Sequence, residues 1–246
     1  MRYIASCSGG KDSVAQLIIA KEHDEPLDEV VYCEVMFSPE ISGEVPEHRD
    51  FIYQTVRPYV ENVLQVPFVI LRSKKTYLDV FNHIVSRGDH AGKTNGFAIP
   101  FMCAVNRDCK IPPITKYWKA HSVDVTQYVG IAADEPERLE RLRGTNKISL
   151  LEKYNITERD ALKICKEHGL LSPIYEIAKR NGCWFCPNCS DDEWAHMIYQ
   201  HEELFDLLID LELNTENIYR RCLTRAETPT QLKRRILSYG EQIKLF

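Results

Sequence analysis

The stretch Ser6-Cys7-Ser8-Gly9-Gly10-Lys11-Asp12-Ser13 decides the fold of this 246-residue chain. It lies between a short apolar segment at residues 3–5 and an apolar helical pattern that begins at residue 14. Two adjacent glycines can adopt positive φ and let the backbone approach an anion closely. The N–H groups at the start of a helix point toward the same place, and a lysine and hydroxyl groups flank it. The stretch therefore predicts a phosphate-binding loop between a strand and a helix.

Short runs of β-branched and aromatic residues alternate with helical patterns over the first 170 residues or so. Strands are expected at residues 3–7, 30–37, 67–72 and 126–132. Helices are expected at residues 13–22, 45–63, 77–87, 114–121, 136–143 and 158–168. This alternation is typical of βαβ units. It predicts an α/β fold with a Rossmann-like parallel sheet and helices on both faces.

The rest of the chain has a different pattern. Residues 88–113 are rich in glycine and proline and are expected to form a long loop. After residue 190 only helical patterns remain, at residues 193–210, 215–223 and 230–239. We therefore expect two domains: a nucleotide-binding domain at 1–190 and an all-helical extension at 191–246.

Composition and charge give expectations about the partners and the compartment of the protein. The formal net charge is −5, which gives no global reason to expect a nucleic-acid partner. No apolar run approaches the ~18 residues of a membrane span, and the first expected strand leaves no room for a signal peptide. We therefore expect a cytoplasmic protein without a membrane partner. One late stretch is basic and contains Arg220, Arg221, Arg225, Lys233, Arg234 and Arg235. We favour its interpretation as a solvated helix face, and binding of tRNA or another nucleic acid stays open.

The glycine loop resembles a known family once further motifs are added. It lacks the spacing of a Walker loop and of the dinucleotide fingerprint G-x-G-x-x-G. The SGGKDS motif is similar to the loop of the N-type ATP pyrophosphatases. Four later motifs follow in the order found in the PAPS-reductase-like branch: Ser42-Gly43-Glu44-Val45-Pro46-Glu47, the segment at 130–138, Ser172-Pro173-Ile174-Tyr175 and Gly182-Cys183-Trp184-Phe185-Cys186. The resemblance covers residues 3–190.

The resemblance implies an adenine nucleotide α-hydrolase-like fold that binds ATP with Mg²⁺. A substrate oxygen then attacks the α-phosphate, and the products are an adenylylated substrate and pyrophosphate. Because the loop is intact here, ATP is favoured over PAPS. The implied nucleotide contacts are Ser6, Ser8, Gly9, Gly10, Lys11, Asp12, Ser13, Gly43, Glu47, Gly130, Asp134 and Glu135. The implied catalytic residues are Lys11, Asp12 and Arg138.

Some of these residues have a purely structural interpretation. Glu44, Glu47 and His48 also suit the acidic first turn of a helix. Asp134 and Glu135 with Arg138 also suit a helix start with an i,i+3 ion pair.

Nine cysteines are many for a cytosolic chain, where disulfides are disfavoured. Cys7, Cys33, Cys165 and Cys222 are expected to be buried apolar residues. The C-x₂-C-x₂-C spacing of Cys183, Cys186 and Cys189 can present three thiolates to one centre. The family places a fourth ligand in an earlier cysteine loop, which points to Cys103, with Cys109 as the substitute. A [4Fe–4S] cluster, a four-thiolate zinc ion and a metal-free thiol set all stay open.

Three classes of function follow from these patterns. The first is an ATP-dependent enzyme that adenylylates an unidentified acceptor in sulfur-transfer chemistry, with thiolation of a nucleic-acid base as one version. The second is a thiol reductase acting on PAPS or APS, which is disfavoured because no cysteine follows Cys222. The third is a non-catalytic nucleotide-binding module with a structural metal site. A homodimer is a further open expectation.

Overall fold

The computed structural model describes residues 1–100, 102–121, 124–179 and 182–243. Residues 239–243 are described by their backbone alone. The chain forms two compact units. The first comprises Met1–Glu34, Val45–Arg72 and Pro113–Asn181, and the second comprises Val35–Glu44, Ser73–Pro112 and Gly182–Phe246. These units are defined by contacts in space, whereas the domain boundary expected at residue 190 is based on sequence motifs. That boundary stays a prediction.

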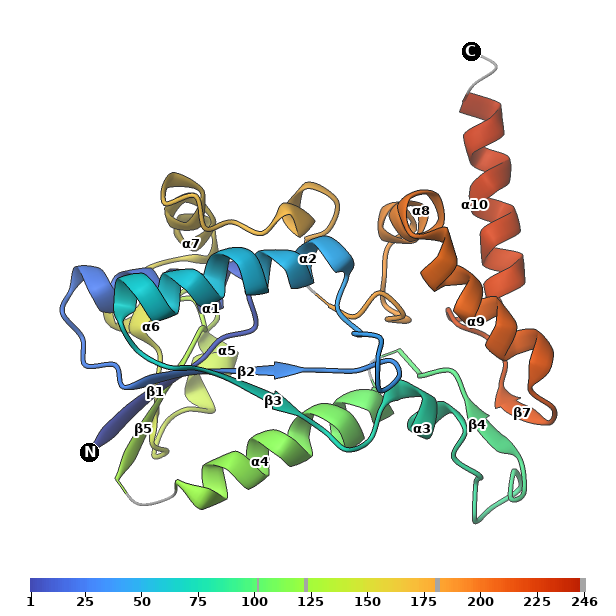
Figure 1. Cartoon of the computed structure of the whole chain (residues 1–246), viewed down its shortest axis with the longest axis horizontal. Coiled ribbons are helices and arrows are strands. Elements are labelled where there is room, and N and C mark those ends of the chain that lie inside the picture. The colour runs from blue at the N-terminus through green and yellow to red at the C-terminus, as the bar shows by residue number, and fades with distance from the viewer. Residues whose placement is uncertain (101, 122–123, 180–181, 244–246) are drawn as a thin grey trace. The chain divides into compact units, whose positions relative to one another are not determined.

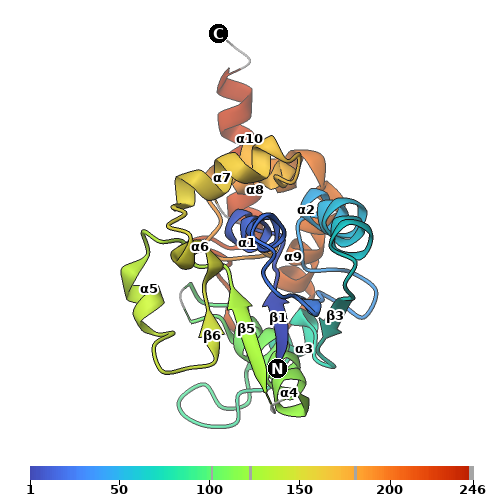
Figure 2. The same ribbon diagram turned by 90° about the vertical axis from the view of Figure 1, so that its left-hand side faces the viewer.

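The first unit is built on a five-stranded sheet in which every pairing is parallel. The strand order is β3-β2-β1-β5-β6, and Figure 2 shows the sheet nearly end-on. Its strands are β1 (Arg2–Ser6), β2 (Glu29–Glu34), β3 (Phe68–Arg72), β5 (Val125–Val129) and β6 (Lys147–Ile148). The order reverses between β1 and β5, and ligands bind at such a reversal, at the carboxyl ends of the strands. The expected parallel α/β sheet is confirmed.

Alternating side chains along the strands form a core on each face of the sheet. Ala5, Tyr32 and Tyr128 belong to the larger core, which also includes residues of α1 (Lys11–Glu22), α6 (Leu150–Lys153) and α7 (Glu158–Glu167). Ile4 and its neighbours on the other face pack against Tyr117 and Trp118 of α4 (Ile111–Ala120). Figure 1 shows α1 and α4 on opposite sides of the strands. The expectation of helices on both faces is therefore confirmed.

The helix expected at 45–63 is present but is not a regular α-helix. It begins as α2 (Pro46–Phe51) and continues through two wider π-type turns, Ile52–Val56 and Tyr59–Leu64. It ends at Gln65, whose φ of 57° is left-handed. Two short helical segments, α5 (Pro136–Glu140) and a 3₁₀ turn at Pro173–Glu176, complete the first unit.

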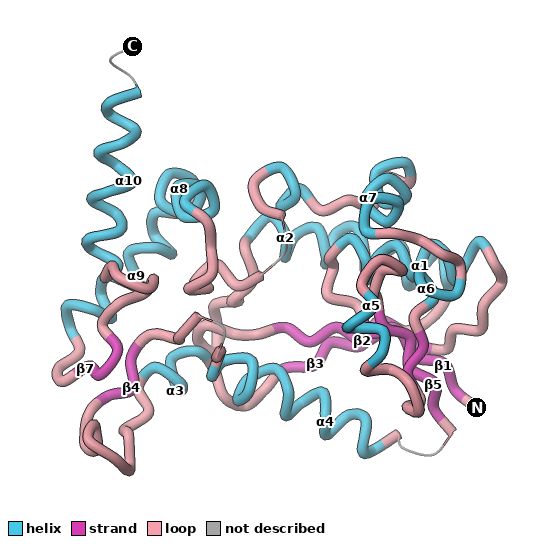
Figure 3. Tube along the Cα trace, turned by 180° about the vertical axis from the view of Figure 1, so that it is seen from behind, coloured by secondary structure: helices cyan, strands magenta, loops and turns pink. Residues whose placement is uncertain are grey.

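The second unit is mainly helical and contains one small two-stranded sheet. Its helices are α3 (Tyr77–Phe81), α8 (Asp191–Gln200), α9 (Glu202–Asn214) and α10 (Pro229–Ile243), with a π-type turn at Asn106–Lys110. The strands β4 (Thr94–Gly96) and β7 (Ile218–Arg220) pair in parallel, and Figure 3 shows them side by side. Within the described ranges, no helix has the length and apolar character needed to cross a membrane.

Several local expectations were wrong. Residues 215–223 form β7 rather than a helix, because Phe97 N–H donates to the Arg220 carbonyl across the small sheet. The expected helical C-terminal region is therefore confirmed in α8, α9 and α10, but β7 interrupts it. Residues 88–113, of which residue 101 lies outside the described residues, contain β4 and helical turns rather than one loop. The helix expected at 77–87 ends at Phe81, and the one expected at 193–210 is divided at His201.

Candidate nucleotide-binding loop and cysteine site

The loop between β1 and α1 has a backbone that only glycine accommodates. Gly9 has a φ of +75°. A Cβ atom there would lie 2.6 Å from Ile52 Cγ1 and 2.9 Å from His48 Cε1. Both the backbone conformation and the close approach to α2 therefore exclude a side chain at this position.

Hydrogen bonds within the loop hold it in shape. The Ser13 hydroxyl donates to the Gly10 carbonyl at 2.8 Å and accepts from the Ser8 N–H at 3.1 Å. Gly10 is the residue before the helix, and Val14 N–H makes the first intrahelical bond to its carbonyl. The first-turn N–H groups point out of the helix end, where the helix dipole favours negative charge, and that of Lys11 donates to the Tyr175 hydroxyl at 2.8 Å. The loop thus has a fixed shape at a helix start, and its role in binding a phosphate stays a prediction.

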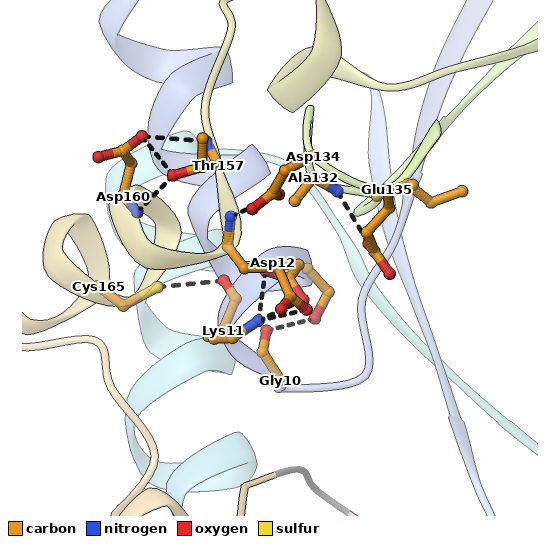
Figure 4. A network of polar contacts seen from close by, with 12 residues as sticks. Gly10, Lys11, Asp12, Ala132, Asp134, Glu135, Thr157, Asp160 and Cys165 are labelled. Carbon is orange, nitrogen blue, oxygen red and sulfur yellow. Dashed lines mark hydrogen bonds and ion pairs between the residues drawn. The ribbon is translucent and has the colours of Figure 1, made fainter. Parts of the chain in front are cut away.

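Lys11 brings a positive charge to this loop and is held by two carboxylates (Figure 4). Its Nζ lies 2.9 Å from Asp12 Oδ1 and 3.2 Å from Glu158 Oε1. Burial alone would lower the pKa of Lys11, but hydrogen bonds and charge from Asp12 and Glu158 raise it above its ordinary value. The lysine therefore stays charged and can exchange a carboxylate for a phosphate.

Acidic groups gather beside Lys11 at the carboxyl end of β5. Asp134 Oδ1 accepts the Glu158 N–H at 3.0 Å, and Glu135 Oε2 accepts the Ala132 N–H at 3.1 Å (Figure 4). Burial raises the pKa of Asp12, and the charges of Glu158 and Glu135 add to that rise against the opposing effect of Lys11. Carboxylates crowded beside a phosphate site suit Mg²⁺, which binds one or two carboxylates together with phosphate oxygens.

Arg138 forms an ion pair with Glu135, as the structural interpretation of this turn expected. The Arg138 side chain is half exposed, with 52% of its surface accessible. Its catalytic role stays a prediction.

Three residues from outside the loop fix its position. His48 is fully buried and bridges the Ser8 carbonyl at 3.0 Å and the Ser172 hydroxyl at 2.8 Å. The Lys11 N–H donates to the Tyr175 hydroxyl at 2.8 Å. Sequence reasoning quoted the Ser172–Tyr175 motif without assigning it a role. It missed Glu158 altogether, because only the tertiary fold brings that residue to Lys11.

Gly130 and Ser6 lie at the strand ends that flank the loop. A Cβ atom on Gly130 would lie 2.7 Å from the Asp12 carbonyl oxygen and 2.7 Å from Ser13 N. Gly130 therefore lets the first turn of α1 approach β5. The Ser6 hydroxyl accepts from Gln127 Nε2 at 2.8 Å, which links β1 and β5.

Two of the expected nucleotide contacts, Glu47 and Gly43, are not part of the loop or of the strand ends beside it. Glu47 lies half-buried on α2, next to His48. Gly43 belongs to the second unit, where its N–H donates to the Val35 carbonyl at 2.8 Å. A Cβ atom on Gly43 would lie 3.0 Å from the Phe185 ring, so packing accounts for the glycine. The nucleotide roles of both residues stay predictions.

The C-x₂-C-x₂-C segment is anchored within the second unit by aromatic packing and strand-like contacts. Trp184 N–H donates to the Gly43 carbonyl at 3.0 Å, and its ring lies 4.7 Å from that of Phe37. Phe185 lies 4.2 Å from the Tyr77 ring, between ring centres. Cys186 N–H donates to the Cys183 carbonyl at 3.0 Å, so the segment turns back on itself. The backbone thereby gathers the cysteines.

The structure brings Cys103 into the electrostatic environment of Cys183. Burial raises the pKa of Cys183 well above its ordinary value, and Glu44, Cys186 and Cys103 add to the rise against Lys110. By contrast, burial and the neighbouring Asp108 raise the pKa of Cys109 to about 11. Cys109 is also completely inaccessible. The coupling between Cys103 and Cys183 favours Cys103 as the fourth ligand, which stays a proposal.

The spacing of the thiols bears on the choice of metal. Tetrahedral zinc with bonds of ~2.3 Å needs sulfur atoms about 3.8 Å apart. Among the described residues, which include all four of these cysteines, no three cysteine sulfur atoms lie within 4.8 Å of one another. A [4Fe–4S] cluster takes a wider set of thiolates, since its irons lie between them. The donor set is soft and thiolate-rich and fits such a cluster.

Three of the four cysteines that were expected to be buried apolar residues are buried. Cys7, Cys33 and Cys165 are buried. Cys222 is exposed, so the expectation that it is buried was wrong. It follows β7, in the segment that was expected to be helical.

Five of the six cations of the late basic stretch fall into two groups in the structure, and the sixth, Arg234, is exposed. Lys233 pairs with Glu202 and Asp206, and Arg235 pairs with Asp191 and Glu227. These pairs connect helices α8, α9 and α10 and account for both cations structurally. Arg220, Arg221 and Arg225 instead lie on and after β7 and line a hollow surface of the second unit.

Comparison with known proteins yields a weak structural likeness. No family model matches the sequence, and no curated protein is significantly similar to it. Among solved structures, the chain is similar to the U34-tRNA thiolase NcsA from Methanococcus maripaludis, determined with its [4Fe–4S] cluster. The alignment has 14% sequence identity and a TM-score of 0.39, and covers 98% of this chain and 72% of the thiolase. A TM-score this low supports neither a shared activity nor a shared ligand.

Proposed function

We propose that this chain is an ATP-binding enzyme of the PP-loop superfamily that adenylylates an acceptor oxygen in sulfur-transfer chemistry. The observation that carries the proposal is the preformed loop at 8–13, with Lys11 at its centre and carboxylates beside it. A plain strand-to-helix turn needs neither a charged lysine held at the helix start nor a ring of acids around it. The acceptor that we favour is an oxygen of a nucleic-acid base.

The proposed reaction has two steps. The acceptor oxygen attacks the α-phosphorus of ATP, and the bond from that phosphorus to the bridging α–β oxygen breaks. Pyrophosphate then leaves with the bond's electrons and is held by the Lys11 side chain and the positive end of the α1 dipole. A reduced sulfur nucleophile displaces AMP from the activated acceptor, so that sulfur replaces the original oxygen. The protein contributes preorganised positive charge where negative charge develops.

Individual residues have separate tasks in this scheme. Asp12 and Glu135 would hold Mg²⁺ against the phosphates. Asp134 fixes the start of α7 and so places Glu158 beside Lys11. Arg138 would exchange Glu135 for a phosphate oxygen when ATP is bound, because its half-exposed guanidinium is free to turn.

The cysteine segment would hold the [4Fe–4S] cluster through Cys103, Cys183, Cys186 and Cys189, with zinc as the alternative. When bound, the cluster would supply a site that holds sulfur. Reduced thiols of this kind suit the cytoplasm, which is the compartment that we propose.

The experiment is to identify the products of ATP in the presence of candidate acceptors, RNA among them. AMP and pyrophosphate formed by the wild-type protein but not by Lys11→Ala would support the proposal. ADP and orthophosphate would contradict it. Sulfite release from PAPS or APS without ATP would instead establish the reductase. ATP binding without turnover on any acceptor would favour the nucleotide-binding module.

A further inference from the structure

Beside the cysteine segment of the second unit lies a buried tyrosine whose hydroxyl has no acceptor. Tyr77 is the first residue of α3, and only 1% of its surface is exposed. No atom of the described residues forms a hydrogen bond with its hydroxyl. A buried hydroxyl without a partner costs free energy, so native proteins contain few of them and each needs an explanation.

The Tyr77 ring is held in one place by its surroundings. It lies 4.2 Å from the Phe185 ring and 5.2 Å from the Phe37 ring, between ring centres. The Tyr77 N–H donates to the Met36 carbonyl at 2.8 Å, and the Thr76 side chain caps the helix directly before it. The hydroxyl therefore cannot reach another partner unless these groups move.

Two of the proposed metal ligands lie near this hydroxyl. Phe185, which packs on the Tyr77 ring, stands between Cys183 and Cys186 in the C-x₂-C-x₂-C segment. Burial raises the pKa of Tyr77, and the charges of Cys103 and Cys183 add to that rise. The phenol therefore stays protonated, and it is a hydrogen-bond donor beside sulfur atoms from both cysteine segments.

A thiol and a thiolate differ as partners for such a donor. A neutral thiol sulfur is a weak acceptor, whereas a thiolate carries a negative charge and accepts a stronger hydrogen bond. In the chain by itself, burial and the charge of Glu44 disfavour the thiolate of Cys183. A metal holds its cysteine ligands as thiolates. Metal binding would therefore create the acceptor that the Tyr77 hydroxyl lacks.

We propose that Tyr77 is a positioning residue of the metal centre, whose hydroxyl donates a hydrogen bond to the metal-bound thiolate of Cys103 or Cys183. Such an outer hydrogen bond fixes a ligand in place. At an iron–sulfur cluster it also raises the reduction potential, because it stabilises the added negative charge of the reduced state. The inference rests on the proposed function only for the presence of a metal at these cysteines, and it needs neither ATP nor an acceptor.

The first test measures how firmly the full chain holds iron after anaerobic reconstitution with iron and sulfide. Tyr77→Phe should still bind iron, because the four thiolates remain. In excess EDTA it should lose its absorbance near ~400 nm about tenfold or more faster than the wild type. The matched control is Tyr128→Phe, a tyrosine buried in the sheet of the first unit, which should lose absorbance at the wild-type rate. Equal rates for Tyr77→Phe and the wild type would overturn the proposal.

The second test is a redox titration of the same proteins, followed by electron paramagnetic resonance. Tyr77→Phe should shift the midpoint potential to a more negative value, and Tyr128→Phe should leave it unchanged. A tyrosine that only packs against Phe185 would not move the potential when it is replaced by phenylalanine. Full iron content with an unchanged potential would overturn the role of Tyr77 and leave the proposed metal centre standing. Wild-type protein that binds no iron would overturn both.

The third test compares thermal unfolding with and without the metal. Without it, Tyr77→Phe should raise the unfolding midpoint by about 2–4 °C, because the substitution removes a buried hydroxyl that has no partner. With the metal bound, the same substitution should lower the midpoint, because the hydrogen bond to the thiolate is lost. This reversal of sign distinguishes a donor to the metal centre from a structural hydroxyl. A lower midpoint in both states would show that the hydroxyl has a partner in the metal-free chain and would overturn the proposal.

Discussion

The glycine loop of the first unit and the cysteine segment of the second unit differ in what fixes their geometry. The loop is shaped by the polypeptide itself, through Gly9 against α2 and the Ser13 hydroxyl across the turn. The cysteine segment has a fixed backbone, but burial and the charge of Glu44 raise the pKa of the Cys183 thiol and so disfavour its thiolate. Under the proposed function, the loop would accept its ligand without changing shape, whereas the cysteine segment would need a metal to take the charge of its thiolates.

The largest expected effect is the loss of the metal. Cys183→Ser should abolish iron binding, or zinc binding, because a central thiolate ligand is removed. Metal analysis and the absorbance near ~400 nm of anaerobically purified protein measure this. ATP affinity should stay unchanged if the two regions are independent. Full metal content in this variant would contradict the ligand set.

Two further variants, Cys103→Ser and Cys109→Ser, test which of these cysteines is the fourth metal ligand. The first should lose metal and the second should keep it, because Cys109 is completely buried and Cys103 lies near Cys183. Loss of metal in Cys109→Ser but not in Cys103→Ser would show that Cys109 is the fourth ligand instead.

The next effect tests whether the loop is shaped by its glycine. Gly9→Ala should destabilise the protein by about 2–4 kcal/mol through backbone strain and overpacking against Ile52. Gly144→Ala is the matched control, since Gly144 has a φ of +72° but nothing within 4 Å of an added Cβ. Urea unfolding of both variants isolates the contact. Equal losses in the two would show that α2 does not constrain the loop.

Removal of the central charge is expected to weaken ATP binding without unfolding the chain. Lys11→Ala should lower ATP affinity roughly 10- to 150-fold, because a charge-assisted contact contributes ~1.5–3 kcal/mol. Lys21→Ala, an exposed lysine at the other end of α1, should leave it unchanged. Isothermal calorimetry gives both values, and equal affinities for Lys11→Ala and wild type would contradict the phosphate contact.

The smallest effect concerns support for the loop from the Ser172–Tyr175 motif. Tyr175→Phe leaves the Lys11 N–H without its acceptor and should lower ATP affinity by about 0.5–1.5 kcal/mol, or roughly two- to tenfold. Tyr154→Phe removes a similar hydroxyl, bonded to Glu25 away from the loop, and should not change ATP affinity. A loss in both variants would indicate a general change of stability instead.

The sequence predicted those parts of the fold that depend on local pattern. The alternation of apolar strands and helices was sufficient for the parallel sheet, and Gly9-Gly10-Lys11 was sufficient for the loop at its edge. The strands β4 and β7 could not be found in this way. Their pairing joins residues more than 120 positions apart, and the segment at 215–223 carries a helix-like pattern that this pairing overrides.

The supporting residues of the loop were hidden for the same reason. Glu158 starts a helix with a capping box at Thr157 and Asp160, so its sequence context signals only a helix start. Its role appears when α7 packs on α1 and brings its carboxylate to Lys11. The basic stretch likewise could not be divided from sequence, because the acids that pair with Lys233 and Arg235 come from other helices.

The most direct test of the central claim is a calorimetric titration of the wild-type protein with pyrophosphate, ATP and AMP in the presence of Mg²⁺. If the loop at 8–13 holds the β- and γ-phosphates, ATP and pyrophosphate should both bind and Lys11→Ala should weaken both in the same proportion. AMP should be unaffected by that substitution. ATP that binds as AMP does, with no binding of pyrophosphate and no effect of Lys11→Ala, would contradict the account.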